Sequence, residues 1–181
     1  MVPIMTKIAI CYGSRYGTTT SVVQEMTKVA EGSGAEVDAI VLKTQTLPSA
    51  LYEYDLIIIG SGIQAGRWTK EPLEFIKENL GSLSKKKVAL FVVCGDAGSP
   101  DKCDNAQALY LDAISAEYPG LSPVSTGLFG GMYNFEKYNF VTRALVKKIV
   151  KRSLPEGEEL PEIIDFRNWD QIRSWISGLL Q

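Results

Sequence analysis

The order of apolar and polar positions along the chain predicts a regular alternation of strands and helices. Five short segments rich in apolar residues predict β-strands: Lys7–Tyr12, Glu36–Leu42, Leu56–Gly60, Lys87–Cys94 and Ser122–Phe129. The third and fourth of them, LIIIG and KVALFVVC, are apolar almost throughout. An unbroken apolar run is typical of a strand that is buried on both faces of a parallel sheet.

Helical spacing of apolar residues marks most of the segments between these strands. It predicts helices over Thr18–Glu31, Glu71–Leu80, Asn105–Glu117, Phe140–Arg152 and Asn168–Leu180. The helix expected after the second strand is placed in Leu47–Tyr54, and Ser153–Pro161 is interpreted as a linker. Because right-handed crossovers join parallel strands, this alternation predicts a three-layer, doubly wound α/β fold with a five-stranded parallel sheet. Five strands favour the order 2-1-3-4-5 over a six-stranded dinucleotide fold.

Length and charge narrow the class of protein. The chain has 181 residues, which suits a single domain over residues 1–181, and its formal net charge is −2. This small charge gives no indication of a nucleic-acid partner. No run approaches the ~18 continuous apolar residues that a transmembrane segment needs. Since residues 1–6 also lack the pattern of a signal peptide, we expect a cytoplasmic protein.

The side chains that this chain offers for catalysis indicate that redox chemistry would need a bound cofactor. Histidine is absent, which removes the usual general base and the commonest zinc ligand. The cysteines Cys11, Cys94 and Cys103 form no CxxC pair, so we expect neither a disulfide framework nor a metal site. Cys94 is interpreted either as a reactive thiol or as a small buried side chain at the end of a strand. A protein of this composition that does redox chemistry needs an organic cofactor.

A phosphate-binding loop is predicted after the first strand. Residues 13–20 have the sequence GSRYGTTT and lead directly into a helix. Glycine lets the backbone approach a ligand closely, and the helix start offers unpaired N–H groups at the positive end of its dipole. The hydroxyls of Ser14, Thr18 and Thr19 add uncharged donors. Together these groups indicate a phosphate site, whereas a plain N-cap needs only one hydroxyl.

Two other nucleotide motifs do not fit the chain. The first loop has neither the lysine nor the glycine spacing of a P-loop, and it lacks the GxGxxG of a dinucleotide site. The later sequence GSGIQA, residues 60–65, matches GxGxxA but follows the third strand and leads into no obvious helix. Strands one and three are neighbours in the order 2-1-3-4-5, so the loops after them are expected to meet in one crevice.

The first loop resembles the phosphate loop of the flavodoxin family, Ser/Thr-x-x-G-x-T. The resemblance implies a flavodoxin-like fold that binds FMN non-covalently, with phosphate contacts from Ser14, Arg15, Tyr16, Gly17, Thr18 and Thr19. It also implies that two later loops flank the flavin ring, the first through Ser61, Gly62, Ile63, Gln64, Ala65, Gly66 and Trp68, and the second through Cys94, Gly95 and Asp96. Trp68 is interpreted either as stacking on the ring or as packing on the core.

Other segments resemble one branch of that family. The loop GSGIQAGRW, the aromatic insertion over residues 130–140, a basic helix and the closing IDFRNWDQIRSWI are similar to the flavodoxin-type, quinone-dependent protoporphyrinogen oxidases. The aromatic insertion is interpreted either as a lid or partner surface beside the flavin or as packing under a long loop. The basic helix is interpreted as a solvated face, with an acidic partner or membrane headgroups as alternatives.

Three functions stay open from the sequence. An electron carrier would pass electrons from FMN to a redox partner protein. An oxidoreductase would act on a small redox substrate, and the resemblance implies a porphyrinogen and a quinone. A flavin-free signalling module would need acidic residues at the strand ends, which the first strand, ending CYGSR, lacks. A homodimer is left open in each case.

Overall fold

The centre of the molecule is a parallel sheet whose strand order confirms the predicted 2-1-3-4-5. The structure, a computed structural model, describes residues 5–152 and 154–181. Its main strands are β1 (Lys7–Gly13), β2 (Glu36–Val41), β3 (Leu56–Gln64), β5 (Lys87–Cys94) and β6 (Ser125–Gly130). They lie in the order β2-β1-β3-β5-β6, and the short β4 (Arg67–Trp68) pairs antiparallel with the end of β3.

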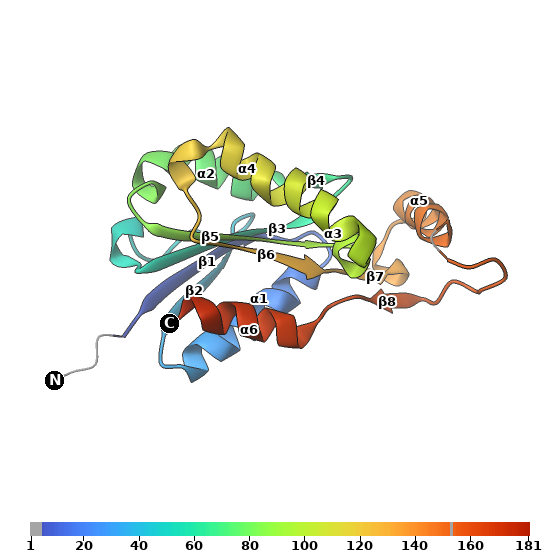
Figure 1. The fold of residues 1–181 in the computed structure, drawn as a ribbon, viewed down its shortest axis with the longest axis horizontal. Coiled ribbons are helices and arrows are strands. Elements are labelled where there is room, and N and C mark those ends of the chain that lie inside the picture. The colour runs from blue at the N-terminus through green and yellow to red at the C-terminus, as the bar shows by residue number, and fades with distance from the viewer. Residues whose placement is uncertain (1–4, 153) are drawn as a thin grey trace.

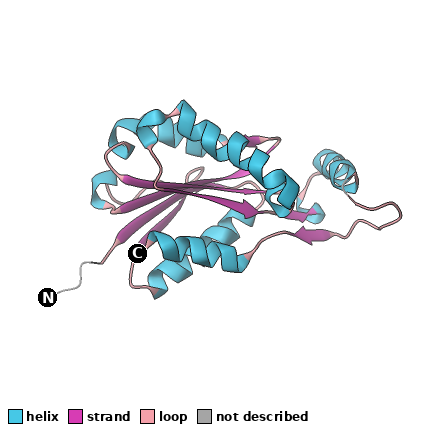
Figure 2. Cartoon of the chain, viewed as in Figure 1, coloured by secondary structure: helices cyan, strands magenta, loops and turns pink. Residues whose placement is uncertain are grey.

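Helices cover both faces of this sheet and give the predicted three layers (Figures 1 and 2). One face is covered by α1 (Thr18–Gly32) and α6 (Trp169–Leu179), and the other by α2 (Lys70–Leu83), α3 (Pro100–Gln107) and α4 (Ala113–Glu117). The side chains of β1 alternate between the two layers: Ala9 and Cys11 join the core with α2, whereas Ile8 and Ile10 join the core with α1 and α6. This double coverage is why the apolar runs are unbroken.

The strongest apolar runs form the buried centre. Leu56, Ile57, Ile58 and Ile59 of β3 are all buried, as are the residues of β5 after Lys87. Burying one such aliphatic side chain stabilises the fold by roughly 1.5–3 kcal/mol. Within the described parts of the chain, no helix is both long and apolar enough to cross a bilayer.

Two predicted elements differ from the structure. The helix predicted over Asn105–Glu117 begins earlier, at Pro100, because proline is favoured in the first helical turn and Asp101 suits the positive end of the helix dipole. It then passes through a π-helical turn, Ala108–Asp112, before α4. In Leu47–Tyr54 only one 3-10 turn forms, Leu51–Glu53.

A second, two-stranded sheet lies beyond the carboxyl end of β6, and the sequence did not predict it. It pairs β7 (Met132–Asn134) antiparallel with β8 (Ile163–Asp165). The helix α5 (Phe140–Lys151) lies between these strands in the sequence and projects beside the main body (Figure 1). Residues 154–161 of the predicted linker have no helix or strand, while Ser153 and residues 1–4 lie outside the described residues.

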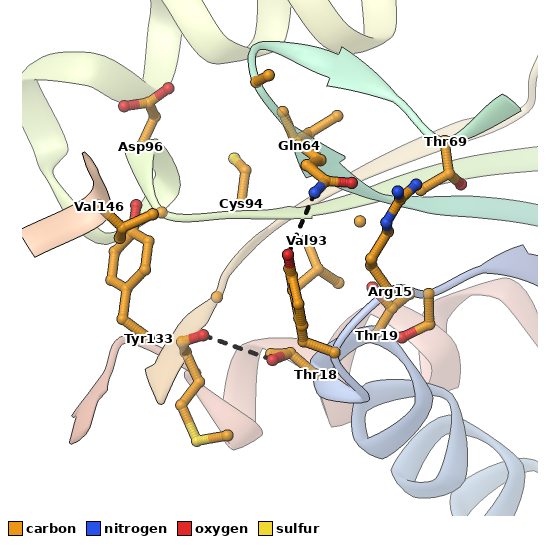
Figure 3. Close-up of a pocket in the computed structure, with 18 of the residues that line it drawn as sticks. Arg15, Thr18, Thr19, Gln64, Thr69, Val93, Cys94, Asp96, Tyr133 and Val146 are labelled. Carbon is orange, nitrogen blue, oxygen red and sulfur yellow. Dashed lines mark hydrogen bonds between the residues drawn. The ribbon is translucent and has the colours of Figure 1, made fainter. Parts of the chain in front are cut away.

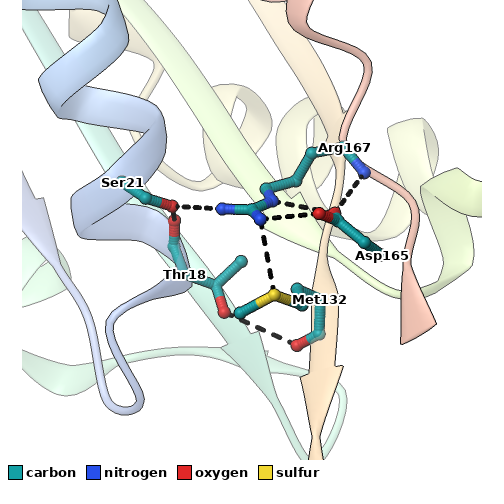
Figure 4. A network of polar contacts seen from close by, with 5 residues as sticks. All are labelled: Thr18, Ser21, Met132, Asp165 and Arg167. Carbon is teal, nitrogen blue, oxygen red and sulfur yellow. Dashed lines mark hydrogen bonds and ion pairs between the residues drawn. The ribbon is translucent and has the colours of Figure 1, made fainter. Parts of the chain in front are cut away.

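An arginine after β8 connects the small sheet to α1 (Figure 4). Arg167 donates two hydrogen bonds to the carboxylate of Asp165, Nε to Oδ1 at 2.8 Å and Nη2 to Oδ2 at 2.6 Å. Its Nη1 donates to Ser21 Oγ on α1 at 2.8 Å. These hydrogen bonds lower the pKa of Asp165 below its ordinary value. The same guanidinium also lies over the ring of Trp169, 4.7 Å from its centroid, which fixes the start of α6.

This pairing predicts a small acid sensitivity. Because the pKa of Asp165 is lower in the folded protein, the ion pair stabilises the fold above about pH 4, and this stabilisation is lost as the pH falls through the lowered pKa. Asp165→Asn should therefore lose less stability than the wild type between neutral and acid pH. The difference should stay below about 1 kcal/mol, since the carboxylate is partly exposed. Urea unfolding at several pH values measures it, with the highly exposed Asp170→Asn as control. Equal acid sensitivity in the wild type and D165N would contradict the prediction.

Candidate functional site

The first loop and the start of α1 form a cradle of unpaired donors. Gly17 adopts a left-handed backbone with φ of 89°, a conformation that favours glycine. The Ser21 amide is bonded to the Gly17 carbonyl at 3.1 Å, and no side chain caps the helix. Thr19 as a residue is only 3% exposed, and it lines the cavity that opens here. Free helix amides beside such a hydroxyl suit a phosphate.

This cradle opens into a cavity of about 310 Å³ at the carboxyl ends of the parallel strands (Figure 3). All three predicted loops line it. The predicted residues that line it are Ser14, Arg15, Tyr16, Thr18, Thr19, Gly62, Ile63, Gln64, Ala65, Gly66, Cys94, Gly95 and Asp96. The volume lies at the lower end of the range for small-molecule and cofactor sites. The sheet topology therefore brings together segments that lie about 80 residues apart in the sequence.

The second loop is a tight hairpin. After β3 ends at Gln64, Ala65 and Gly66 turn with positive φ of 48° and 72°, and the chain returns as β4. Two consecutive positive φ angles are typical of the two-residue turns that join antiparallel strands. The GxGxxA match is thus part of a hairpin and starts no helix. A Cβ at Gly62 would lie 2.7 Å from Thr19 Oγ1, so glycine here lets the hairpin approach the phosphate cradle.

Three predicted residues lie outside the cavity lining and support it from behind. Gly17 shapes the first loop through its backbone. Ser61 is fully buried, and its Oγ accepts a hydrogen bond from the Thr69 amide at 2.8 Å. Trp68 packs into the core on the α2 side, where its indole N–H donates to the Tyr110 carbonyl at 2.6 Å. Its ring does not line the cavity.

The π-helical turn places Tyr110 between the two ring-flanking loops. Its carbonyl accepts the Trp68 hydrogen bond from the hairpin side, and its hydroxyl lies 3.4 Å from Asp96 Oδ2 in the third loop. A π turn breaks the regular hydrogen-bond ladder of a helix and is frequent at functional sites. Tyr110 also lines the cavity, although the sequence pattern around it indicated only a helix.

The thiol in the third loop is buried and inert. Cys94 is 4% exposed, and burial raises the pKa of its thiol to about 11. A thiol with this pKa stays protonated at neutral pH, so it is a poor nucleophile. Between the two interpretations of Cys94, the structure favours the small buried side chain.

A fourth wall, whose residues were not among the predicted cofactor contacts, comes from the aromatic insertion with β7 and from α5. Its lining residues are Gly131, Met132, Tyr133, Tyr138, Thr142, Val146 and Ile149. A Cβ at Gly95 would lie 1.8 Å from the Tyr133 hydroxyl, so this tyrosine rests directly on the third loop. The rings of Tyr16 and Tyr138 pack edge to face, with their centroids 4.7 Å apart. The aromatic insertion therefore both packs under its own loop and forms a side of the cavity.

Lys137 in the same insertion brings a positive charge to the phosphate cradle. Its ammonium group donates to the Tyr16 carbonyl at 3.4 Å. It also lies 3.7 Å from where a Cβ of Gly17 would stand. The sequence places this lysine 120 residues after Gly17, and only the folding of the insertion back onto the first loop brings them together.

Comparison with known proteins settles the family. A family model described as a flavodoxin domain matches residues 9–158. The chain belongs to the flavodoxin family. Two relatives are named protoporphyrinogen IX dehydrogenase (quinone): the Leishmania major protein is 23% identical over 94% of this chain and 73% of its own length, and the Escherichia coli K12 protein is 22% identical over 93% and 92%. The oxidised flavodoxin 1 of Bacillus cereus matches with a TM-score of 0.52 at 20% identity, over 83% of this chain and 100% of its own. The family is the one that the sequence resembles, and both relatives carry the name of the branch that it resembles.

FMN is the cofactor of this flavodoxin domain, and the donors around the cavity fit it. The uncapped start of α1 and the Thr19 hydroxyl suit a phosphate. The rest of the lining is largely apolar or glycine backbone, which suits a flat ring system that is held between two loops.

Proposed function

We propose that this chain transfers electrons through FMN held in the cavity between the three loops. The supporting observation is that an uncapped helix start and two glycine-containing loops converge on one cavity at the carboxyl edge of the sheet. In this proposal Ser14, Thr18 and Thr19 hold the phosphate, and the segments Gly62–Gly66 and Cys94–Asp96 flank the ring. FMN, when bound, supplies one- and two-electron redox chemistry.

The protein's own residues would bind and orient the FMN and tune the charge that its ring can carry. The amides of α1 and the ammonium group of Lys137 offset the phosphate charge. The Asp96 carboxylate at the cavity edge disfavours further negative charge there. Arg67 is exposed and does not line the cavity, so it is not placed to offset Asp96. We therefore infer that Asp96 lowers the affinity of the site for an anionic ring.

A second candidate function is dehydrogenation of a porphyrinogen with a quinone as acceptor. Two observations support it. Both relatives described above carry the name of such an enzyme. In addition, Val146 and Ile149 of α5 give the cavity an apolar outer wall, which suits a large apolar substrate beside the flavin.

A spectroscopic experiment tests the shared core of both candidates, and turnover separates them. The purified protein should retain flavin absorbance bands through gel filtration after incubation with FMN, and dithionite should bleach them. The electron carrier should then reduce a one-electron protein acceptor without consuming a small substrate. Turnover of protoporphyrinogen IX that depends on an added quinone would select the second candidate. A protein that retains no flavin after reconstitution would overturn both.

A further inference from the structure

The helix α5 presents two different faces. Thr142, Val146 and Ile149 line the cavity, and Val150 packs with Phe135 and Tyr138 in a small core of its own. Figure 1 shows that α5 lies outside the three-layer body, beyond the carboxyl ends of the strands. The side of the helix that points away from the cavity therefore has no neighbouring element of the sheet to cover it.

That outer face carries large apolar side chains that are exposed to solvent. Phe140 is 86% exposed, Val141 is 74% exposed and Leu145 is 58% exposed. Val141 and Leu145 are four residues apart, so they lie on the same side of the helix, with Phe140 at its start. Apolar side chains that gather at one place on a surface mark an interaction site, whereas single exposed ones need no explanation.

The same helix is strongly basic. The segment 140–152 contains Arg143, Lys147, Lys148, Lys151 and Arg152 and no acidic residue, although the whole chain has a net charge of −2. Two of these cations have internal partners: Arg143 donates to the carbonyls of Phe135 and Glu136, and Lys147 lies over the Phe135 ring.

The other three cations share the outer side with the apolar residues. Residues 141, 145, 148 and 152 follow the spacing of one helix face, which places Lys148 and Arg152 in line with Val141 and Leu145. Lys148, Lys151 and Arg152 are exposed, and no carboxylate of the described residues pairs with them.

We propose that the outer face of α5 docks on an anionic phospholipid surface. Phe140, Val141 and Leu145 enter the headgroup region, and Lys148, Lys151 and Arg152 contact the lipid phosphates. A helix that mixes bulky apolar residues with lysine and arginine fits such an interface, because the long basic side chains extend their charges toward the headgroups while their aliphatic stems stay with the apolar residues. An acidic protein partner would complement the cations but would leave the apolar residues beside them unmatched.

The acidic segment after α5 sets the strength of this attraction. It contains Glu156, Glu158, Glu159 and Glu162, which nearly cancel the charge of α5 at long range. Docking therefore depends on close contact of the helix face, and removing exposed glutamates should strengthen it. This gives the proposal a variant whose effect is a gain, which loss of folding cannot imitate.

Vesicle sedimentation tests the proposal. The wild type should co-sediment with phosphatidylcholine vesicles that contain phosphatidylglycerol, and much less with pure phosphatidylcholine.

Lys148→Gln/Lys151→Gln should weaken binding about tenfold or more, and Phe140→Ser/Val141→Ser should weaken it by a similar factor. Glu158→Gln/Glu159→Gln should strengthen it several-fold. The controls make the same kinds of change at exposed residues outside α5: Lys28→Gln/Lys85→Gln, in α1 and after α2, and Tyr52→Ser, in the turn Leu51–Glu53. They should bind as the wild type does.

The outcomes separate docking from the redox function, because sedimentation requires no flavin chemistry. Circular dichroism first confirms that each variant is folded. If the wild type co-sediments with neither kind of vesicle, the proposal is overturned, even if the protein binds an acidic protein. If the α5 variants bind vesicles as strongly as the wild type does, the proposal is also overturned, since another surface would then be responsible.

Discussion

Replacing Thr19 by valine should weaken FMN binding roughly 10–100-fold while leaving the fold intact. Valine keeps the shape of threonine but removes the hydroxyl of a residue that lies at the start of α1 and lines the cavity. A hydrogen bond to a charged group contributes about 1.5–3 kcal/mol, which corresponds to this range of affinity. The variant keeps the hydroxyls of Ser14 and Thr18 in the cavity lining, so the loss should stay within this range.

Quenching of flavin fluorescence on titration with apoprotein measures this effect. Thr20→Val is the matched control, since it makes the same change one residue along the helix at a position outside the cavity lining. We expect its dissociation constant to stay close to that of the wild type. If T19V bound FMN as tightly as T20V, the phosphate could not lie on Thr19, and the orientation proposed for the cofactor would be wrong.

Replacing Gly60 by alanine should be among the most destabilising single methyl additions in the chain. Gly60 lies opposite Phe91 on the neighbouring strand, and an added Cβ would stand 2.0 Å from the Phe91 ring. The ring is buried and contacts Phe129 and Trp175, so it has no free space to move into. Overpacking of this kind costs about 3 kcal/mol, which should lower Tm by roughly 6–12 °C in a chain of this size.

A second glycine gives the matched control for this experiment. Gly81 lies within α2, and nothing stands within 4 Å of its added Cβ. Gly81→Ala should therefore raise stability by roughly 0.5–1 kcal/mol, because alanine has the higher helix propensity. Thermal unfolding followed by circular dichroism compares the two. A neutral G60A would show that the Phe91 ring can rearrange and that this part of the core is less rigid than its packing indicates.

The sequence predicted the main sheet well because its signals are local. A run such as LIIIG is apolar throughout, and such runs are rarely anything but buried strands when glycine bounds them. The phosphate cradle was predicted for the same reason, since its glycines, its hydroxyls and the helix start are neighbours in the sequence. Ser61, by contrast, was predicted to lie in the first loop that flanks the flavin ring. It lies buried beneath the cavity instead, because β3 continues through it.

The rest of the site depends on contacts between distant segments. Strands β7 and β8 have three residues each and lie about 30 residues apart, so neither has a pattern long enough to detect. Tyr110 and Lys137 lie in segments whose patterns indicate only a helix and a loop, and folding alone brings Tyr110 to the cavity and Lys137 to the first loop. The aromatic insertion did carry a signal, but its composition could not distinguish a cavity wall from packing under a loop.

The pairing of β7 with β8 makes the region around α5 a replaceable module. Asn134 and Ile163 are opposite each other, so residues 135–162 leave the small sheet and return to it at a single point. Because the two ends of this segment are close together, the segment constrains the rest of the chain little. The entropy cost of closing it changes only slowly with its length. Lengthening, trimming or exchanging it would leave the five main strands and α6 in place. Because Tyr138, Thr142, Val146 and Ile149 of this segment line the cavity, exchanging it would remodel one wall of the site without rebuilding the sheet and loops that form the rest.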